Sequence, residues 1–318
     1  MSNRSNTTAA LSDFTSMPQL LCSQQQYRLI DTKKSNQALE VRCLEVTQRN
    51  WSRVATGLVT EPSVGQNRLF LKQYVDRAGE SNEKLWSYER SGVEIAEVAL
   101  GQHICIPKLV ASDRTLLINA FEHEEILSMD ELLRADRAAF ESAYPIALEC
   151  MFEILHQLKV HDTEGYQLPQ KTRDFGDDIL CLNFKGFELR NMGVHTLIQG
   201  IPKHEDFFLF DFGRPYLAPI QEAAAKLFVS IGLLNWGRPL SRFSKGPDFK
   251  LLEAARQRFL PYLDHKAIAA EIQLQRSFRW AEIQGTGSLE RSVKRLAINT
   301  LGGRYFYRLE NWCKSALS

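Results

Sequence analysis

The hydrophobic and polar positions of this chain change their spacing well before its middle. Residues 39–46 alternate between apolar and polar side chains with a period of two, which is typical of a half-buried strand. Residues 53–60 and 68–75 follow as two further strands, and Pro62 and Gly65 mark the turn between them. Strands in direct succession favour an antiparallel sheet at the start of the folded chain.

One helix and two more strands complete the first part of the chain. Apolar residues in 83–100 recur near the helical period, and residues 104–110 and 115–121 then predict strands around a polar turn. Residues 122–125 predict a connector, beyond which the pattern becomes mostly helical. We therefore predict a boundary between a sheet-containing lobe and a helical lobe near this connector.

The predicted architecture is α+β and two-lobed, with three segments along the chain. Residues 1–38 are rich in Ser, Asn, Thr and Gln, which favours a loose arm. Residues 39–122 are expected to form a small antiparallel-sheet lobe with one helix, and residues 123–318 a larger, mainly helical lobe. The larger lobe is predicted to hold strands at residues 179–182, 192–198 and 207–210, and helices at residues 129–133, 138–158, 218–234, 249–263, 266–283, 288–301 and 305–316.

Composition and charge narrow the classes of function. The chain has 318 residues, of which 44% are hydrophobic and 24% charged, as in globular proteins, and its net charge of +1 predicts no nucleic-acid partner. Its six cysteines are scattered without a Cys-x-x-Cys pair, which favours a reduced, cytoplasmic protein over a disulfide or zinc framework. The first residues show no apolar signal core, and no apolar run reaches membrane-spanning length.

The candidate chemistry begins at residues 207–213, with the sequence Phe-Phe-Leu-Phe-Asp-Phe-Gly. The apolar residues predict a buried strand, and a carboxylate at the end of that strand is costly unless a cation compensates its charge. Asp-Phe-Gly after an apolar strand is typical of the metal site of kinase-type phosphotransferases. A second copy at residues 174–176 follows a polar stretch and is expected in a loop, so Asp211 is the predicted metal ligand.

Residues upstream extend this pattern. Lys72 lies in an apolar strand, where its ammonium needs a counter-charge, and the following helix offers Glu89. Asn191 directly precedes the predicted hairpin that ends at Asp211. In its order of elements and in these residues, the stretch 39–240 resembles the protein-kinase-like superfamily, which includes protein kinases, aminoglycoside and choline phosphotransferases and lipopolysaccharide core kinases.

The resemblance implies a role for each of these residues. Lys72 would grip the phosphates of ATP, and Glu89 would face it, because the family's glutamate usually lies near the start of this helix; Glu94 is the alternative. Asn191 and Asp211 would hold Mg²⁺, which makes Asp211 part of the catalytic machinery. ATP and Mg²⁺ are therefore the expected cofactors.

One position departs from the family pattern. The pattern places a catalytic aspartate five positions before the asparagine, where this chain has Gly186. Glu188, in the same loop, is the candidate replacement as the base that takes the proton of the acceptor, and Asp162, Asp177 and Asp178 are alternatives. The same departure leaves a second function open, that of a pseudokinase serving as a nucleotide-binding or scaffold module.

Two further differences concern the acceptor. Residues 47–53 join the first two predicted strands without a glycine, and no Ala-Pro-Glu follows Asp211, so the chain lacks two marks of protein kinases. Small-molecule and glycan kinases of the superfamily often lack the glycines as well. We therefore expect transfer of the γ-phosphate of ATP to a hydroxyl of a sugar, a glycolipid or another small molecule.

The last third of the chain is rich in basic and aromatic residues. Helices of this kind can make peripheral contact with the inner face of a membrane, or hold an anionic glycan. They can also form an amphipathic bundle with the aromatic face in the core, which the near-neutral net charge favours.

Overall fold

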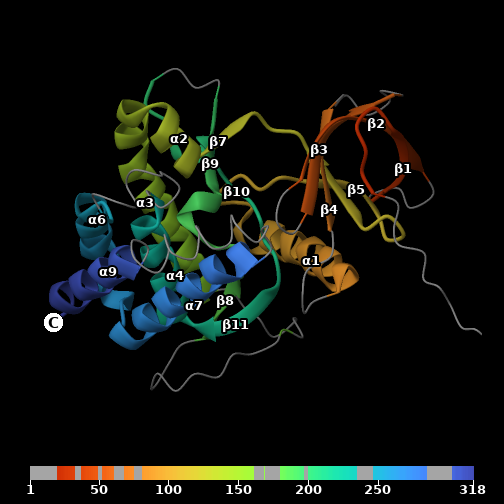
Figure 1. Ribbon diagram of the computed structural model, residues 1–318. Helices are drawn as coiled ribbons and strands as arrows, with labels where there is room; N and C mark the ends of the chain where they lie inside the picture. Colours follow the sequence, from red (N-terminus) through yellow and green to blue (C-terminus); the bar gives the residue numbers. More distant parts are fainter. Residues whose placement is uncertain are drawn as a thin grey trace, which may run out of the picture.

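The computed structural model describes residues 20–32, 37–48, 52–60, 68–74, 81–160, 168, 180–196, 200–234, 246–284 and 303–318. These residues form two lobes, one built mainly of strands and one mainly of helices (Figure 1). Residues 123–125 connect the two lobes, at the place where the sequence predicts the connector.

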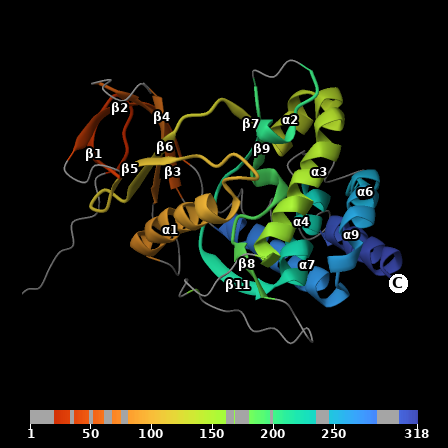
Figure 2. The same ribbon diagram turned by 180° about the vertical axis from the view of Figure 1, so that it is seen from behind.

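The smaller lobe is a closed barrel of antiparallel strands. In barrel order the strands are β1 (Gln26–Asp31), β2 (Ala38–Gln48), β3 (Ser52–Val59), β4 (Arg68–Tyr74), β6 (Ile118–Glu122) and β5 (Leu109–Asp113). Helix α1 (Asn82–Leu100) lies between the barrel and the larger lobe, as both views show (Figure 1, Figure 2). Ser81 caps α1, because its side chain accepts a hydrogen bond from the N–H of Lys84.

Two strands of the barrel differ from the prediction. β1 lies within residues 1–38, for which the sequence predicts a loose arm, and its Tyr27 and Leu29 are buried in the barrel. The prediction of an arm is therefore wrong for this strand. β5 begins at Leu109 rather than near residue 104, after Pro107, which has no N–H to donate to a ladder.

The larger lobe contains two small sheets and most of the helices. One sheet has the order β10 (Phe207–Leu209), β9 (Met192–His195) and β7 (Ile126–Ser128), and the other pairs β11 (Pro215–Pro219) with β8 (Leu180–Phe184). The helices are α2 (Met129–Ala135), α3 (Arg137–Val160), α4 (Ile220–Gly232), α6 (Phe249–Phe259), α7 (His265–Gln284) and α9 (Gly303–Ala316). The predicted helix at 288–301 lies outside the described residues.

The two lobes have separate hydrophobic cores, and α1 contributes to the larger one. The barrel core includes Leu29 and Leu71. The core of the larger lobe includes Val93, Ala96 and Leu100 of α1 together with residues of α3 and α4. One face of α1 is therefore held by the larger lobe, although the helix follows the strands of the barrel in the sequence.

Three of the four aromatic side chains of α9 pack against the protein, whereas Tyr307 is exposed. Tyr305 and Phe306 are buried, and Trp312 stacks on Phe228 of α4 at a ring-centroid distance of 6.0 Å. This packing matches the bundle alternative for α9, and membrane contact stays a prediction. Of the helices in the described part of the chain, none has the length and hydropathy needed to cross a bilayer.

Candidate nucleotide and metal site

Three charged side chains from separate parts of the chain meet at one ammonium group. Lys72 Nζ, on β4, lies 2.7 Å from Glu89 Oε1 on α1 and 2.8 Å from Asp211 Oδ1, which follows β10. Glu94, the alternative partner, instead forms an ion pair of 3.1 Å with Arg90 on the exposed side of α1. The structure thus brings together the predicted lysine, the predicted glutamate and the predicted aspartate.

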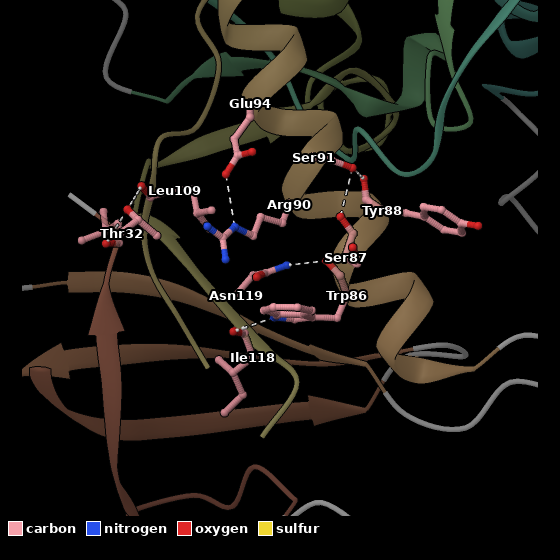
Figure 3. Close-up of polar contacts among 11 residues, drawn as sticks. Thr32, Trp86, Ser87, Tyr88, Arg90, Ser91, Glu94, Leu109, Ile118 and Asn119 are labelled. Atoms are coloured by element: carbon pink, nitrogen blue, oxygen red, sulfur yellow. Dashed lines mark hydrogen bonds and ion pairs between the residues drawn. The ribbon is translucent and has the colours of Figure 1, made fainter. Parts of the chain in front are cut away.

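The tryptophan at the start of α1 fixes the helix on the barrel (Figure 3). Trp86 Nε1 donates a hydrogen bond of 3.2 Å to the carbonyl of Ile118 on β6, and Asn119 Nδ2 donates one of 3.3 Å to the carbonyl of Trp86. Glu89 lies three residues after Trp86 and so shares its face of the helix. These two hydrogen bonds therefore hold the glutamate beside the strand that carries Lys72.

The members of this ion-pair cluster differ in exposure. The side chains of Glu89, Lys72 and Asp211 are 4%, 16% and 49% exposed. Burial by itself would lower the pKa of Lys72, but the carboxylates of Asp211 and Glu89 outweigh burial and raise it, so the ammonium stays charged at neutral pH. Burial raises the pKa of Glu89, against the attraction of Lys72.

Asn191 and Asp211 lie at the same end of one hairpin. Asn191 directly precedes β9 and Asp211 follows β10, and these strands pair with Leu209 opposite Met192. The N–H of Phe210 donates a hydrogen bond of 3.0 Å to the carbonyl of Asn191, which ties the two segments together beyond the strands. The predicted hairpin therefore exists, and it places both predicted metal ligands close together.

The side chain of Asn191 has a defined orientation. Its Nδ2 donates a hydrogen bond of 2.6 Å to the carbonyl of Gly186. Because the amide nitrogen is used in this way, the amide oxygen is the atom that Asn191 can offer to a cation. A cation at this place fits the chemistry of the donors, since Mg²⁺ prefers oxygen ligands and takes only one or two carboxylates beside phosphate and water. The described ranges contain no group of three or more His, Cys, Asp or Glu side chains suited to a metal.

Asp211 adopts an unusual backbone conformation. Its φ angle is +67°, in the left-handed region that few residues other than glycine occupy. The neighbouring Phe212 is buried and packs edge-on against Phe184 of β8 at a centroid distance of 5.2 Å. A buried ring next to a strained residue indicates that the surrounding packing maintains this conformation.

Gly186 lies against both predicted metal ligands. A Cβ atom built on Gly186 would lie 3.0 Å from the carbonyl carbon of Asp211, closer still to its oxygen, and 3.1 Å from Asn191 Nδ2. The position at which the family pattern has its aspartate is therefore inside the site. With the present backbone, however, it has no room for a side chain.

Glu188 does not occupy the position predicted for a base. Its side chain is 6% exposed, forms an ion pair with Arg190 and accepts a hydrogen bond of 3.0 Å from Gln275 Nε2 on α7. Both carboxylate oxygens thus have partners within the larger lobe, an arrangement that argues against the predicted role of Glu188 as the base. The alternatives Asp162, Asp177 and Asp178, like the second Asp-Phe-Gly copy, lie outside the described residues.

A buried polar network lies beneath the loop that holds Gly186 and Glu188, and the sequence pattern alone does not predict it. Lys226 Nζ, on α4, donates hydrogen bonds of 2.8 Å to the carbonyl of Phe184 and 2.7 Å to the hydroxyl of Tyr216, and that hydroxyl donates to Glu222 at 3.0 Å. The spacing of Glu222 and Lys226 in a largely apolar helix is the signal that points to such a network. The network supports the strand that leads into Gly186.

Comparisons with known proteins concern the fold of the chain. No family model matches the chain, and no curated protein matches it either. Among solved structures, the chain is similar to the aminoglycoside phosphotransferase from Streptomyces rimosus, with a TM-score of 0.44 and 13% identity over 71% of this chain and 88% of that one. It is also similar to the choline kinase LicA from Streptococcus pneumoniae, with a TM-score of 0.41 and 17% identity over 82% and 94%.

A further similarity has a higher TM-score. The amicoumacin kinase hAmiN, solved in complex with AMP-PNP, Ca²⁺ and Ami, gives a TM-score of 0.52 with 12% identity, over 83% of this chain and 91% of that chain. At this identity the likeness concerns the fold. The two-lobed α+β architecture predicted from the sequence is confirmed, and the chain has a protein-kinase-like fold.

Proposed function

We propose that the protein is a phosphotransferase that moves the γ-phosphate of ATP to a small-molecule acceptor. The observation that carries the proposal is the cluster of Lys72, Glu89 and Asp211, in which a charged ammonium and a half-exposed carboxylate meet where the lobes join. Lys72 would bind the phosphates of the nucleotide, held in place by its buried ion pair with Glu89.

Asp211 and Asn191 would hold the metal. The side chain of Asp211 is 49% exposed, so it can reach a cation beside the nucleotide, and the amide oxygen of Asn191 is the second candidate ligand. The chemistry that Mg²⁺ supplies when bound is neutralisation of charge on the phosphates. Positioning and charge stabilisation contribute most of phosphoryl transfer, so the glycine at position 186 is compatible with turnover.

For the acceptor, we infer a hydroxyl group on a sugar, a glycolipid or another small molecule. β11 begins at Pro215, four residues after Asp211, which leaves little chain between the metal site and the second sheet for the binding of a protein substrate. The similarity in fold to the amicoumacin kinase hAmiN supports a small acceptor. We propose a cytoplasmic location for the enzyme, with any membrane contact limited to its surface.

A thermal-shift titration with ATP tests the proposal, with and without Mg²⁺. Binding to the folded state raises the melting temperature, and Asp211→Asn should remove the magnesium-dependent part of the increase, because it removes a formal charge from a site for a hard cation. Asp174→Asn, in the second Asp-Phe-Gly copy, is the matched control and should behave as the wild type. Absence of any ATP-dependent shift in the wild type would contradict the proposal.

A turnover assay then separates an enzyme from a pseudokinase. ATP consumption is measured with a panel of sugars, glycolipid headgroups and amino alcohols, and acceptor-dependent formation of ADP is the expected result. ATP binding that is never followed by turnover with any acceptor would favour the nucleotide-binding scaffold.

A further inference from the structure

Two glycines from different lobes lie against consecutive carbonyl groups of the metal-site segment. A Cβ atom on Gly186 would lie 3.0 Å from the carbonyl carbon of Asp211, and one on Gly92 of α1 would lie 3.0 Å from the carbonyl carbon of Phe212. In both cases the oxygen of that carbonyl is nearer still. The backbone of Asp211 and Phe212 therefore passes between two positions at which no side chain fits.

The nature of the obstructing atoms distinguishes these two glycines from Gly232. A Cβ on Gly232 would meet Leu309 Cδ1 at 2.8 Å, which is the end of a side chain that can change its rotamer. At Gly92 and Gly186 the two nearest obstructing atoms belong to the backbone of the segment itself. A side chain there can be accommodated only if Asp211 and Phe212 move.

The conformation of Asp211 explains why such confinement matters. Its φ of +67° is costly for a residue with a side chain and persists only where the surroundings impose it. Gly92 is three residues after Glu89 on α1, so the helix that supplies the partner of Lys72 also supplies one wall. Gly186 accepts the hydrogen bond of Asn191, so the loop that supplies the second wall also orients the other metal ligand.

We propose that Gly92 and Gly186 are positioning residues, and that together they form a slot that fixes the backbone of Asp211 and Phe212. The slot aims the Asp211 carboxylate at Lys72 and keeps it beside Asn191. The glycine at the place of the family's aspartate is then a requirement of this packing. The inference rests on the proposed function, because bound ATP and Mg²⁺ are its main readout.

The test compares Gly92→Ala and Gly186→Ala with Gly232→Ala. Calorimetric titration with ATP and Mg²⁺, at a temperature at which circular dichroism shows every variant folded, should give a Kd at least tenfold higher for the two slot variants. Gly232→Ala should lower the melting temperature and leave Kd within twofold of the wild type. Gly92→Ala keeps the test open if Gly186→Ala does not fold, because alanine favours a helix interior.

A double-mutant cycle separates positioning from general loss of stability. Once Asp211→Asn has removed the carboxylate, Gly186→Ala should change the Kd for ATP and Mg²⁺ by less than twofold. Full affinity in the folded slot variants, or equal effects in both backgrounds, would overturn the proposal.

A readout without ligand distinguishes failure of the slot from failure of the proposed function. The N–H of Lys185 donates a hydrogen bond of 2.8 Å to the carbonyl of Gly213, directly after the segment in the slot. Its hydrogen exchange should be faster by at least tenfold in Gly92→Ala, and unchanged in Gly232→Ala. If the wild type binds no ATP, the proposed function fails, and this exchange rate alone supports or overturns the slot.

Discussion

At the scale of single residues, the two carboxylates beside Lys72 depend on it to different degrees. Glu89 is almost fully buried, and in the described part of the chain its second oxygen, Oε2, has no hydrogen-bond partner. Asp211 is half exposed and can exchange its ion pair for water or a cation. The ammonium of Lys72 thus stabilises the fold through its pair with Glu89, and it serves ligand binding through its pair with Asp211.

Lys72→Met is therefore expected to destabilise the protein as well as to weaken ATP binding. Removing one partner of a buried ion pair leaves an uncompensated charge and costs about 3–5 kcal/mol in the free energy of unfolding, measured by urea denaturation. Asp211→Asn keeps the pair of Lys72 with Glu89, and its cost should stay within about 1 kcal/mol, as for exposed pairs. Equal costs for the two variants would contradict this assignment.

Glu188→Gln is expected to leave turnover nearly unchanged. The variant keeps a carbonyl oxygen for Gln275 and loses the ion pair with Arg190, so a lower melting temperature is the main effect. Loss of a general base typically costs about 10²–10⁴-fold in rate. A fall of that size at unchanged Kd for ATP would restore Glu188 as the base.

Residues of the site could be predicted from the sequence where a charged residue interrupts an apolar pattern. Lys72 and Asp211 stand out in or after buried strands, and the structure brings them together. Glu188 could not be assigned in this way, because it lies in a loop between β8 and β9, where no periodicity shows which way a side chain points. Gly92 was missed for a different reason: a close approach between segments distant in sequence leaves no local pattern.

At the scale of elements, α4 and α7 carry charges into the core of the larger lobe. Glu271 on α7 accepts a hydrogen bond of 2.8 Å from Gln275 and is buried close to Lys226 and Glu222 on α4. Burial raises the pKa of Glu271, and the negative charges of Glu188 and Glu222 add to the effect against the attraction of Lys226. The folded state thus binds the proton of Glu271 more tightly than the unfolded state does.

Glu271→Gln is expected to change how stability depends on pH. Because the folded-state pKa is raised, the contribution of Glu271 is present below its unfolded pKa and is lost as pH rises through the folded value. Glutamine cannot ionise and keeps an oxygen for Gln275. In urea denaturation at a series of pH values, the wild type should lose stability between acidic and neutral pH, and the variant should lose less. Parallel curves would contradict the assignment.

The long helices and the central strands could be predicted because their periodic patterns span several turns or ladder pairs. The strands β1 and β11 could not. β1 follows a polar stretch and has Arg28 in its middle, so its composition resembles that of an arm. β11 lies between Pro215 and Pro219, and proline normally argues against a strand, although here the strand pairs with β8 along its whole length.

At the scale of the whole molecule, the separate hydrophobic cores predict that local unfolding of one lobe leaves the other lobe folded. Leu29→Ala in the barrel core and Leu155→Ala in the core of the larger lobe both truncate a fully buried leucine, at a cost of about 2–5 kcal/mol each. Leu155→Ala should speed hydrogen exchange of α1 amides from Val93 to Leu100, because their side chains pack in the same core. Leu29→Ala should speed exchange in the barrel strands and leave these amides protected.

The pairing of β1 with β5, which closes the barrel, also affects whether the protein can associate with other copies of itself. β1 pairs with β2 on one side and with β5 on the other. In the pair with β5, Ile30 is opposite Ser112 and Asp31 is opposite Ala111, so the barrel has no open edge. Unpaired edges are templates on which a second chain can add a strand, and closure removes them. A chain shortened to begin at Gln37 would lose β1 and uncover two strand edges at once. Its main defect is therefore expected to be self-association through strand exchange, rather than a change in the distant ion-pair cluster.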